Sequence, residues 1–80
     1  MKIEVKLFAT FAGYLREASE SGSAILDVPD GSTVRQLVSS LGIPEEMPAI
    51  TLVNGLDVTL EQVLVDGDVL AMFPPLAGGH

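Results

Sequence analysis

Residues 2–7 and residues 24–28 alternate between apolar and polar positions. A period of two is typical of a strand with one buried face, so both segments are predicted strands. The small polar residues 19–23 predict a turn between them, and the two strands are therefore expected to pair antiparallel. Residues 11–15 are apolar but contain Gly13, and we expect a loop or one short helical turn there.

One helix is predicted after the turn signature at residues 29–31. Thr33 and Gln36 have the spacing of a capping box at its start. Four apolar side chains at helical spacing form a single stripe: Val34, Leu37, Val38 and Leu41. Gly42 suits the position just after the helix, and Pro44 prevents the helix from resuming.

The second half of the chain predicts three more strands. Residues 49–53 and 69–73 are apolar, and residues 56–59 follow the Asn-Gly pair at 54–55, the strongest hairpin signal in the chain. Residues 60–64 predict a single turn of helix. We therefore expect an α+β fold in which a mixed sheet of about five strands packs on one main helix.

Composition restricts the class of protein. The 80 residues suffice for one domain, which we assign to residues 1–73, followed by an extended tail of residues 74–80. The apolar fraction of 48% can form a core. A net charge of −7 argues against binding nucleic acid or an anionic membrane surface. The sequence has no signal-peptide pattern and no apolar run near the roughly 20 residues of a membrane span, so we expect a cytoplasmic protein.

Side chains suited to catalysis or metal binding are scarce. The chain has no Cys, and His80 is its only histidine, so nucleophilic triads and zinc sites lack their residues. The Asp-Gly-Asp segment at 66–68 resembles part of a calcium loop, but the rest of that pattern is missing, and we interpret it as a solvated turn. Glu45 and Glu46 are interpreted as a solvated pair in a loop. We expect no metal and no cofactor bound by the chain itself.

The end of the chain has an unusual composition. Pro74 and Pro75 favour an extended polyproline conformation. Gly78 and Gly79 have no β-carbon, so the end is narrow enough to thread into a partner's cleft. From the first proline to the last glycine the tail can span about 18 Å at roughly 3.1 Å per residue. A frayed terminus with chance glycines is the alternative interpretation.

Five segments of the sequence match a known family, and together they extend over essentially the whole chain. They are VKLFA (5–9), GSTV (31–34) with Leu37, VNG (53–55), LVDGD (64–68) and FPPLAGG (73–79). On these segments the chain resembles the MoaD/ThiS family of sulfur carriers, and within it the small subunits of molybdopterin synthase. The resemblance implies the ubiquitin-like β-grasp fold.

The resemblance also implies a reaction cycle. An E1-like adenylyltransferase of the MoeB/ThiF type would use ATP to adenylate the carboxylate of Gly79, which sulfur then converts to a thiocarboxylate. A carboxylate is ionised at neutral pH and resists nucleophilic attack, which explains the need for activation. The thiocarboxylate would donate sulfur for molybdopterin or tungstopterin synthesis to a partner enzyme such as the molybdopterin synthase large subunit. The carrier itself would supply no catalytic residue.

Three alternatives remain open at this stage. The sulfur could serve thiamine, cysteine, methionine or tRNA thiolation. The chain could be a ubiquitin-like modifier joined to lysines of target proteins, or a non-reactive interaction module.

His80 departs from the family pattern, which usually ends in Gly-Gly. Because Gly79 is joined to His80 by a peptide bond, it has no carboxylate to adenylate. His80 is either removed by a processing protease or a residue added by recombinant expression, and we favour the processed form. Gly79 is the expected functional residue in both cases.

Phe8, Phe73 and the tail residue Leu76 are the candidates for a partner interface. Phe8 falls on the outward, charged side of the first strand. If Leu70 and Met72 face the helix, Phe73 also points outward, and neighbouring first and last strands present two aromatic rings beside the tail. Exposed aromatic patches commonly mark interfaces. The alternative is that one of the rings folds into the core.

Overall fold

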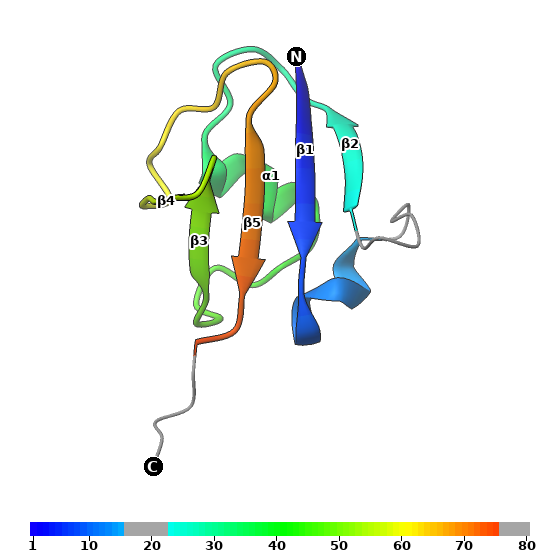
Figure 1. The fold of residues 1–80 in the computed structure, drawn as a ribbon, viewed down its shortest axis with the longest axis vertical. Coiled ribbons are helices and arrows are strands. Elements are labelled where there is room, and N and C mark those ends of the chain that lie inside the picture. The colour runs from blue at the N-terminus through cyan, green and yellow to red at the C-terminus, as the bar shows by residue number, and fades with distance from the viewer. Residues whose placement is uncertain (16–22, 76–80) are drawn as a thin grey trace.

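The elements follow the predicted order of strand, strand, helix and three strands. The computed structural model describes residues 1–15 and 23–75. Its elements are β1 (Lys2–Leu7), the 3₁₀ helix η1 (Ala9–Tyr14), β2 (Ser23–Asp27), α1 (Val34–Ser40), β3 (Ile50–Val53), β4 (Leu56–Asp57) and β5 (Val69–Phe73). The described strands form one sheet in the order β2-β1-β5-β3-β4 (Figure 1).

The sheet is mixed, as predicted. Strand β1 pairs antiparallel with β2 and parallel with β5, and β3 pairs antiparallel with both β5 and β4. Helix α1 lies across one face of this sheet, and Figure 1 views the opposite face. Because β1 and β5 are parallel and adjacent, their C-terminal ends meet at the same edge of the sheet.

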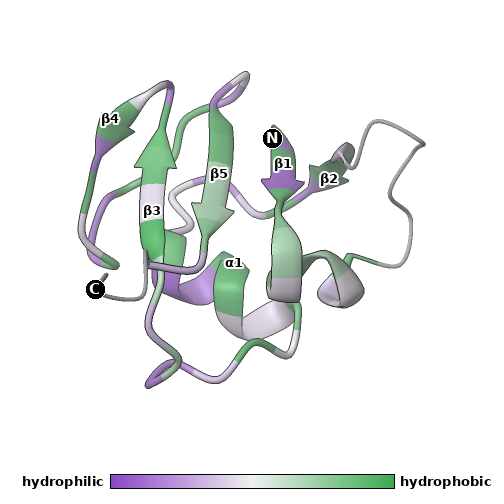
Figure 2. Ribbon diagram, turned by 60° about the horizontal axis from the view of Figure 1, so that its bottom comes forward, coloured by the Kyte–Doolittle hydropathy of each residue, from purple (hydrophilic) through white to green (hydrophobic). Residues whose placement is uncertain are grey.

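The core lies between the sheet and α1. Alternation along the two central strands places Ile3, Val5 and Leu7 of β1 and Leu70 and Met72 of β5 on the inner face, each at most 2% exposed. The helix contributes Val34, Leu37 and Val38, and η1 contributes Phe11. Burying each of these larger side chains contributes roughly 1.5–3 kcal/mol. Their burial is therefore the main reason why the sheet packs against α1. Figure 2 shows the strands lying over α1, with β5 in the green of hydrophobic residues.

The predicted helix start is confirmed. Thr33 Oγ1 accepts a hydrogen bond from the backbone N–H of Gln36 over 3.3 Å, and Gln36 Oε1 accepts from the backbone N–H of Thr33 over 2.8 Å. The helix ends at Ser40, and Gly42 has a φ of +85°, a conformation that glycine adopts without strain. Among the described residues, no helix is long and apolar enough to cross a membrane.

The prediction of a helical turn at residues 60–64 is wrong. Leu60 and Glu61 form a turn, after which the chain is extended and Val63 bridges to Thr33. The carbonyl of Leu60 accepts from Arg35 N–H, and that of Gln62 accepts from Val34 N–H, both over 2.9 Å. The first amides of a helix have no partner within the helix, and the carbonyls of Leu60 and Gln62 supply acceptors for two of them.

Two further expectations are revised. The return strand after the hairpin is only Leu56–Asp57, shorter than residues 56–59, because Val58 and Leu60 turn in to pack against the core. Residues 66–68 do form a turn, but Asp68 is 7% exposed and is therefore not solvated.

Candidate functional site

Phe8 and Phe73 stack against each other on the open face of the sheet. Their ring centroids are 4.6 Å apart and the ring planes differ by 1°. The parallel register places Leu7 beside Met72, and the backbone N–H of Phe8 donates to the carbonyl of Met72 over 3.2 Å. The next residue of each strand is therefore aromatic and points away from the core. The predicted proximity of the two rings is confirmed.

Ile50 extends this aromatic pair across a third strand. It lies opposite Phe73 in the antiparallel register of β3 and β5, so both side chains are on the same face. Ile50 is 38% exposed and Phe8 39%, while Phe73 is half-buried beneath its neighbours. Phe8, Ile50 and Phe73 form a continuous apolar surface, here called the end patch. Apolar surface that is grouped in this way is typical of a docking site.

The end patch lies where the chain leaves the sheet. Strand β5 ends at Phe73, and Pro74 and Pro75 follow directly (Figure 1). Pro74 is half-buried and Pro75 is exposed. The other predicted tail residues, Leu76, Gly78, Gly79 and His80, lie outside the described residues.

Ile50 was missed by the sequence analysis. The signal was present, because Thr51 and Val53 are the buried members of β3 and alternation places Ile50 on the other face. The register that brings Ile50 beside Phe73 depends on pairing between distant strands, which no local pattern encodes.

A charged pair of described residues lies on the same face of the sheet as the end patch. Lys6 points to the same open face as Phe8, and its Nζ lies 3.9 Å from Glu4 Oε2. Both side chains are well exposed, so this contact contributes little to stability. Lys6 is therefore accessible to an acidic group of a docked partner.

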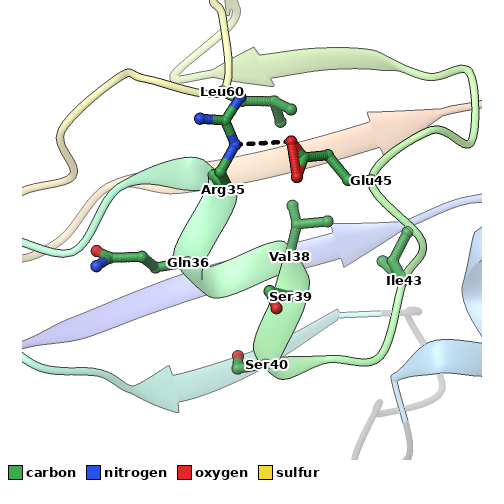
Figure 3. A pocket seen from close by; sticks show the side chains of 8 residues that line it. All are labelled: Arg35, Gln36, Val38, Ser39, Ser40, Ile43, Glu45 and Leu60. Carbon is green, nitrogen blue, oxygen red and sulfur yellow. Dashed lines mark ion pairs between the residues drawn. The ribbon is translucent and has the colours of Figure 1, made fainter.

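A pocket lies on the helix side of the molecule (Figure 3). This pocket of about 430 Å³ is lined in part by Arg35, Val38, Ile43, Glu45 and Leu60. Arg35 Nε lies 2.9 Å from Glu45 Oε2, and its Nη1 lies 2.5 Å from the carboxylate of Glu61. Two carboxylates thus neutralise the guanidinium, so the pocket is not an anion site. Glu45 and Glu46 are both exposed, as predicted, and Glu45 also forms an ion pair with Arg35 at the surface.

Within residues 1–15 and 23–75, no group of three or more His, Cys, Asp or Glu side chains is placed to hold a metal ion. Nor do the pocket residues include a Ser-His or Cys-His arrangement. The sequence-based prediction of chemistry at Gly79 concerns a residue outside the described ranges.

Comparison with known proteins identifies the family. The ThiS family model matches residues 9–79, and the chain belongs to this family of ubiquitin-like sulfur carriers. The match confirms the resemblance derived from the sequence motifs, and it ends at Gly79. No curated protein matches the chain.

Three solved structures illustrate the similarity. The HVO 2177 protein of Haloferax volcanii is 30% identical, with a TM-score of 0.78, covering 99% of this chain and 87% of that one. A putative molybdopterin converting factor subunit 1 from Pyrococcus furiosus is 27% identical, with a TM-score of 0.74, covering 95% and 99%. SAMP1 from Haloferax volcanii is 29% identical, with a TM-score of 0.68, covering 99% and 100%. These likenesses confirm the β-grasp fold.

Proposed function

We propose that this protein carries sulfur as a thiocarboxylate on Gly79 for molybdopterin or tungstopterin synthesis. The observation that supports the proposal most directly is the ThiS family match, which extends to Gly79. The similarity to a putative molybdopterin converting factor subunit 1 favours this pathway among those of the family. Thiamine, cysteine, methionine and tRNA thiolation are the alternatives within the same chemistry.

The chemistry of the cycle takes place at one carboxylate. An E1-like adenylyltransferase joins the Gly79 carboxylate to AMP and releases pyrophosphate from ATP. A sulfur donor then displaces AMP and leaves a thiocarboxylate. The thiocarboxylate passes its sulfur to a substrate on the acceptor enzyme, for which we propose the molybdopterin synthase large subunit, and water restores the carboxylate. ATP is used by the partner, which agrees with the cytoplasmic location that we propose.

Cleavage after Gly79 must precede activation. In the sequence as given, the carbonyl of Gly79 is part of an amide bond to His80, and an amide presents no oxygen anion to attack ATP. A processing protease that removes His80 would create that anion.

We assign the end patch as the surface on which the partners dock. It is apolar, partly exposed and adjacent to Pro74 and Pro75, at the start of the tail. A partner that covers Phe8, Ile50 and Phe73 therefore contacts the domain where the tail that carries Gly79 begins. Interfaces concentrate binding free energy in a few aromatic and aliphatic side chains of this kind.

Intact mass spectrometry tests the proposal. A chain ending at Gly79 is incubated with the E1-like enzyme, ATP and a sulfur source, and exchange of one oxygen for sulfur is expected. Chains ending at Gly78 or at His80 are the matched controls and should stay unchanged. A chain ending at Gly79 that takes up no sulfur would contradict the proposal.

A second candidate is a ubiquitin-like protein modifier, favoured by the 29% identity to SAMP1. In that case the activated Gly79 forms an isopeptide bond with a lysine amine of a target protein. Recovery from cells of target peptides whose lysine is joined to this chain through Gly79 would support this function, and a persistent thiocarboxylate pool without such peptides would contradict it.

A further inference from the structure

Asn54 is held by three hydrogen bonds at the edge of the sheet opposite the tail. Its backbone N–H donates to the Val69 carbonyl over 2.8 Å. Its Oδ1 accepts from the Val69 N–H over 2.9 Å, and its Nδ2 donates to Asp68 Oδ1 over 2.8 Å. The other oxygen of Asp68 accepts from the Val65 N–H over 2.8 Å. We call Asn54, Val65, Asp68 and Val69 the Asn54 cluster.

The orientation of the Asn54 amide follows from its partners. A carboxylate only accepts hydrogen bonds and a backbone N–H only donates, so Nδ2 must face Asp68 and Oδ1 must face Val69. Asp68 is 7% exposed, and a buried carboxylate that loses a donor is costly because its desolvation is then uncompensated. Asn54 therefore supplies a side-chain donor to the buried Asp68 carboxylate and an acceptor to Val69, the first residue of β5.

The residue after Asn54 makes its amide chemically labile. In an open Asn-Gly segment the backbone nitrogen of Gly55 attacks Cγ of Asn54, expels ammonia from Nδ2 and forms a five-membered succinimide. One water molecule then opens the ring to aspartate or isoaspartate. Gly55 has no side chain to obstruct this attack, and its φ of +83° belongs to a turn that favours glycine.

The folded structure opposes the ring-closing step of this reaction. To reach Gly55 N, the Asn54 side chain must rotate and release its bonds to both Asp68 and Val69. The backbone bond from Asn54 N–H to the Val69 carbonyl also restricts the turn. Attack therefore needs local opening of the β3–β4 hairpin, a process whose free energy determines the reaction rate.

We propose that Asn54 is a deamidation site which the folded domain protects through Asp68 and Val69, and whose conversion to aspartate destabilises the start of β5. The new carboxylate has no N–H to give Asp68 and places a like charge against it. The isoaspartate product adds a methylene to the main chain within a two-residue turn. This inference concerns amide chemistry alone and does not depend on sulfur transfer.

Peptide mass spectrometry measures the conversion over days in mildly alkaline buffer. Wild-type protein is compared in the folded state and in concentrated urea. We expect Asn54 of the folded protein to react more slowly by a factor of about ten or more. Gly55→Ala, compared in urea where folding plays no part, should remove the rapid reaction and identify its site. Equal rates in folded and unfolded wild type would overturn the proposal without any variant.

Two folded variants separate the cluster from general stability. Asp68→Ala removes the partner of Asn54 and should accelerate deamidation of the folded protein. Asp66→Ala is the matched control, because Asp66 lies in the same turn as Asp68 but does not bond to Asn54. Its Oδ1 accepts instead from the backbone N–H of Lys2 in β1 over 2.7 Å. Equal rates in these variants would overturn the role of Asp68. Asn54→Asp should lower the urea midpoint, and an unchanged midpoint would overturn the destabilising effect.

Discussion

Phe8 lies flat against Phe73, although one residue follows the first strand and the other ends the last strand. The stack is a consequence of the parallel pairing of β1 and β5, which sets the two positions side by side. Phe8 is 39% exposed and neither ring belongs to the core cluster, so the ring pair leaves apolar surface available to a partner.

Phe73→Ala is expected to weaken binding to the E1-like enzyme about tenfold, because it removes the centre of the end patch. The expected loss of folding stability is about 2–3 kcal/mol, because the half-buried ring loses its apolar burial as well as the stacking contact. Titration calorimetry measures the first quantity and urea unfolding the second. Ile25→Ala is the control, because Ile25 is 66% exposed on the edge strand β2. Equal weakening by both variants would contradict the assignment of the end patch.

Gly78→Val is expected to reduce thiocarboxylate formation at Gly79 about a hundredfold, because a branched side chain obstructs threading into a narrow catalytic cleft. The measurement is intact mass spectrometry of chains ending at Gly79. Folding stability should be unchanged, since position 78 follows the last described strand. Normal sulfur loading of the Gly78→Val chain would show that a narrow tail is not required.

Thr33→Ala is expected to cost about 1 kcal/mol of folding stability, because it leaves the N–H of Gln36 without its capping acceptor. Urea unfolding at neutral pH measures the difference. Ser39→Ala on the exposed side of α1 is the matched control and should change stability by less than about 0.5 kcal/mol. Equal losses in both variants would contradict the role of the capping box.

Asp27 gives the protein a dependence of stability on acid pH. The hydrogen bond and charge of Lys2, whose Nζ lies 3.3 Å from Oδ2, hold the pKa of Asp27 below its ordinary value of 3.8, and the N-terminal amine adds to this effect. Because the folded pKa is the lower one, the stabilisation is present above pH 3.8 and is lost as pH falls through the folded value.

Asp27→Asn is therefore expected to flatten the decline of the urea midpoint in this acid range and to lower the midpoint slightly at neutral pH. Asp57→Asn is the control, because Asp57 is exposed and its carboxylate forms no ion pair with a described residue. A pH profile of Asp27→Asn that coincides with wild type would contradict the assignment.

Local patterns were sufficient to predict much of this fold. Alternation in β1 indicated its buried face, and the spacing of Thr33 and Gln36 indicated the helix start, because both depend on neighbours within a few residues. The outward direction of Phe8 followed from the same alternation. The family motifs pointed to Gly79, whose role no described contact tests.

What the sequence analysis missed depends on distant pairing. Leu64 is 1% exposed in an extended segment that binds the first amides of α1, so tertiary contacts override the local preference for a helical turn. Asp68 was expected in solvent because aspartate is common in turns, but Asn54 gives it a partner from another hairpin. Ile50 joined the end patch through strand register alone.

The shared edge of β1 and β5 has a consequence for kinetics. Six residues after Phe73, Gly79 can lie at most about 21 Å from it, given roughly 3.5 Å per residue. Under the function proposed above, an enzyme that binds the two rings keeps Gly79 within this distance, and capture of the terminus becomes an intramolecular event with an effective concentration on the order of millimolar. Modest affinity for the globule then suffices for rapid turnover, and the spent carrier can still dissociate quickly.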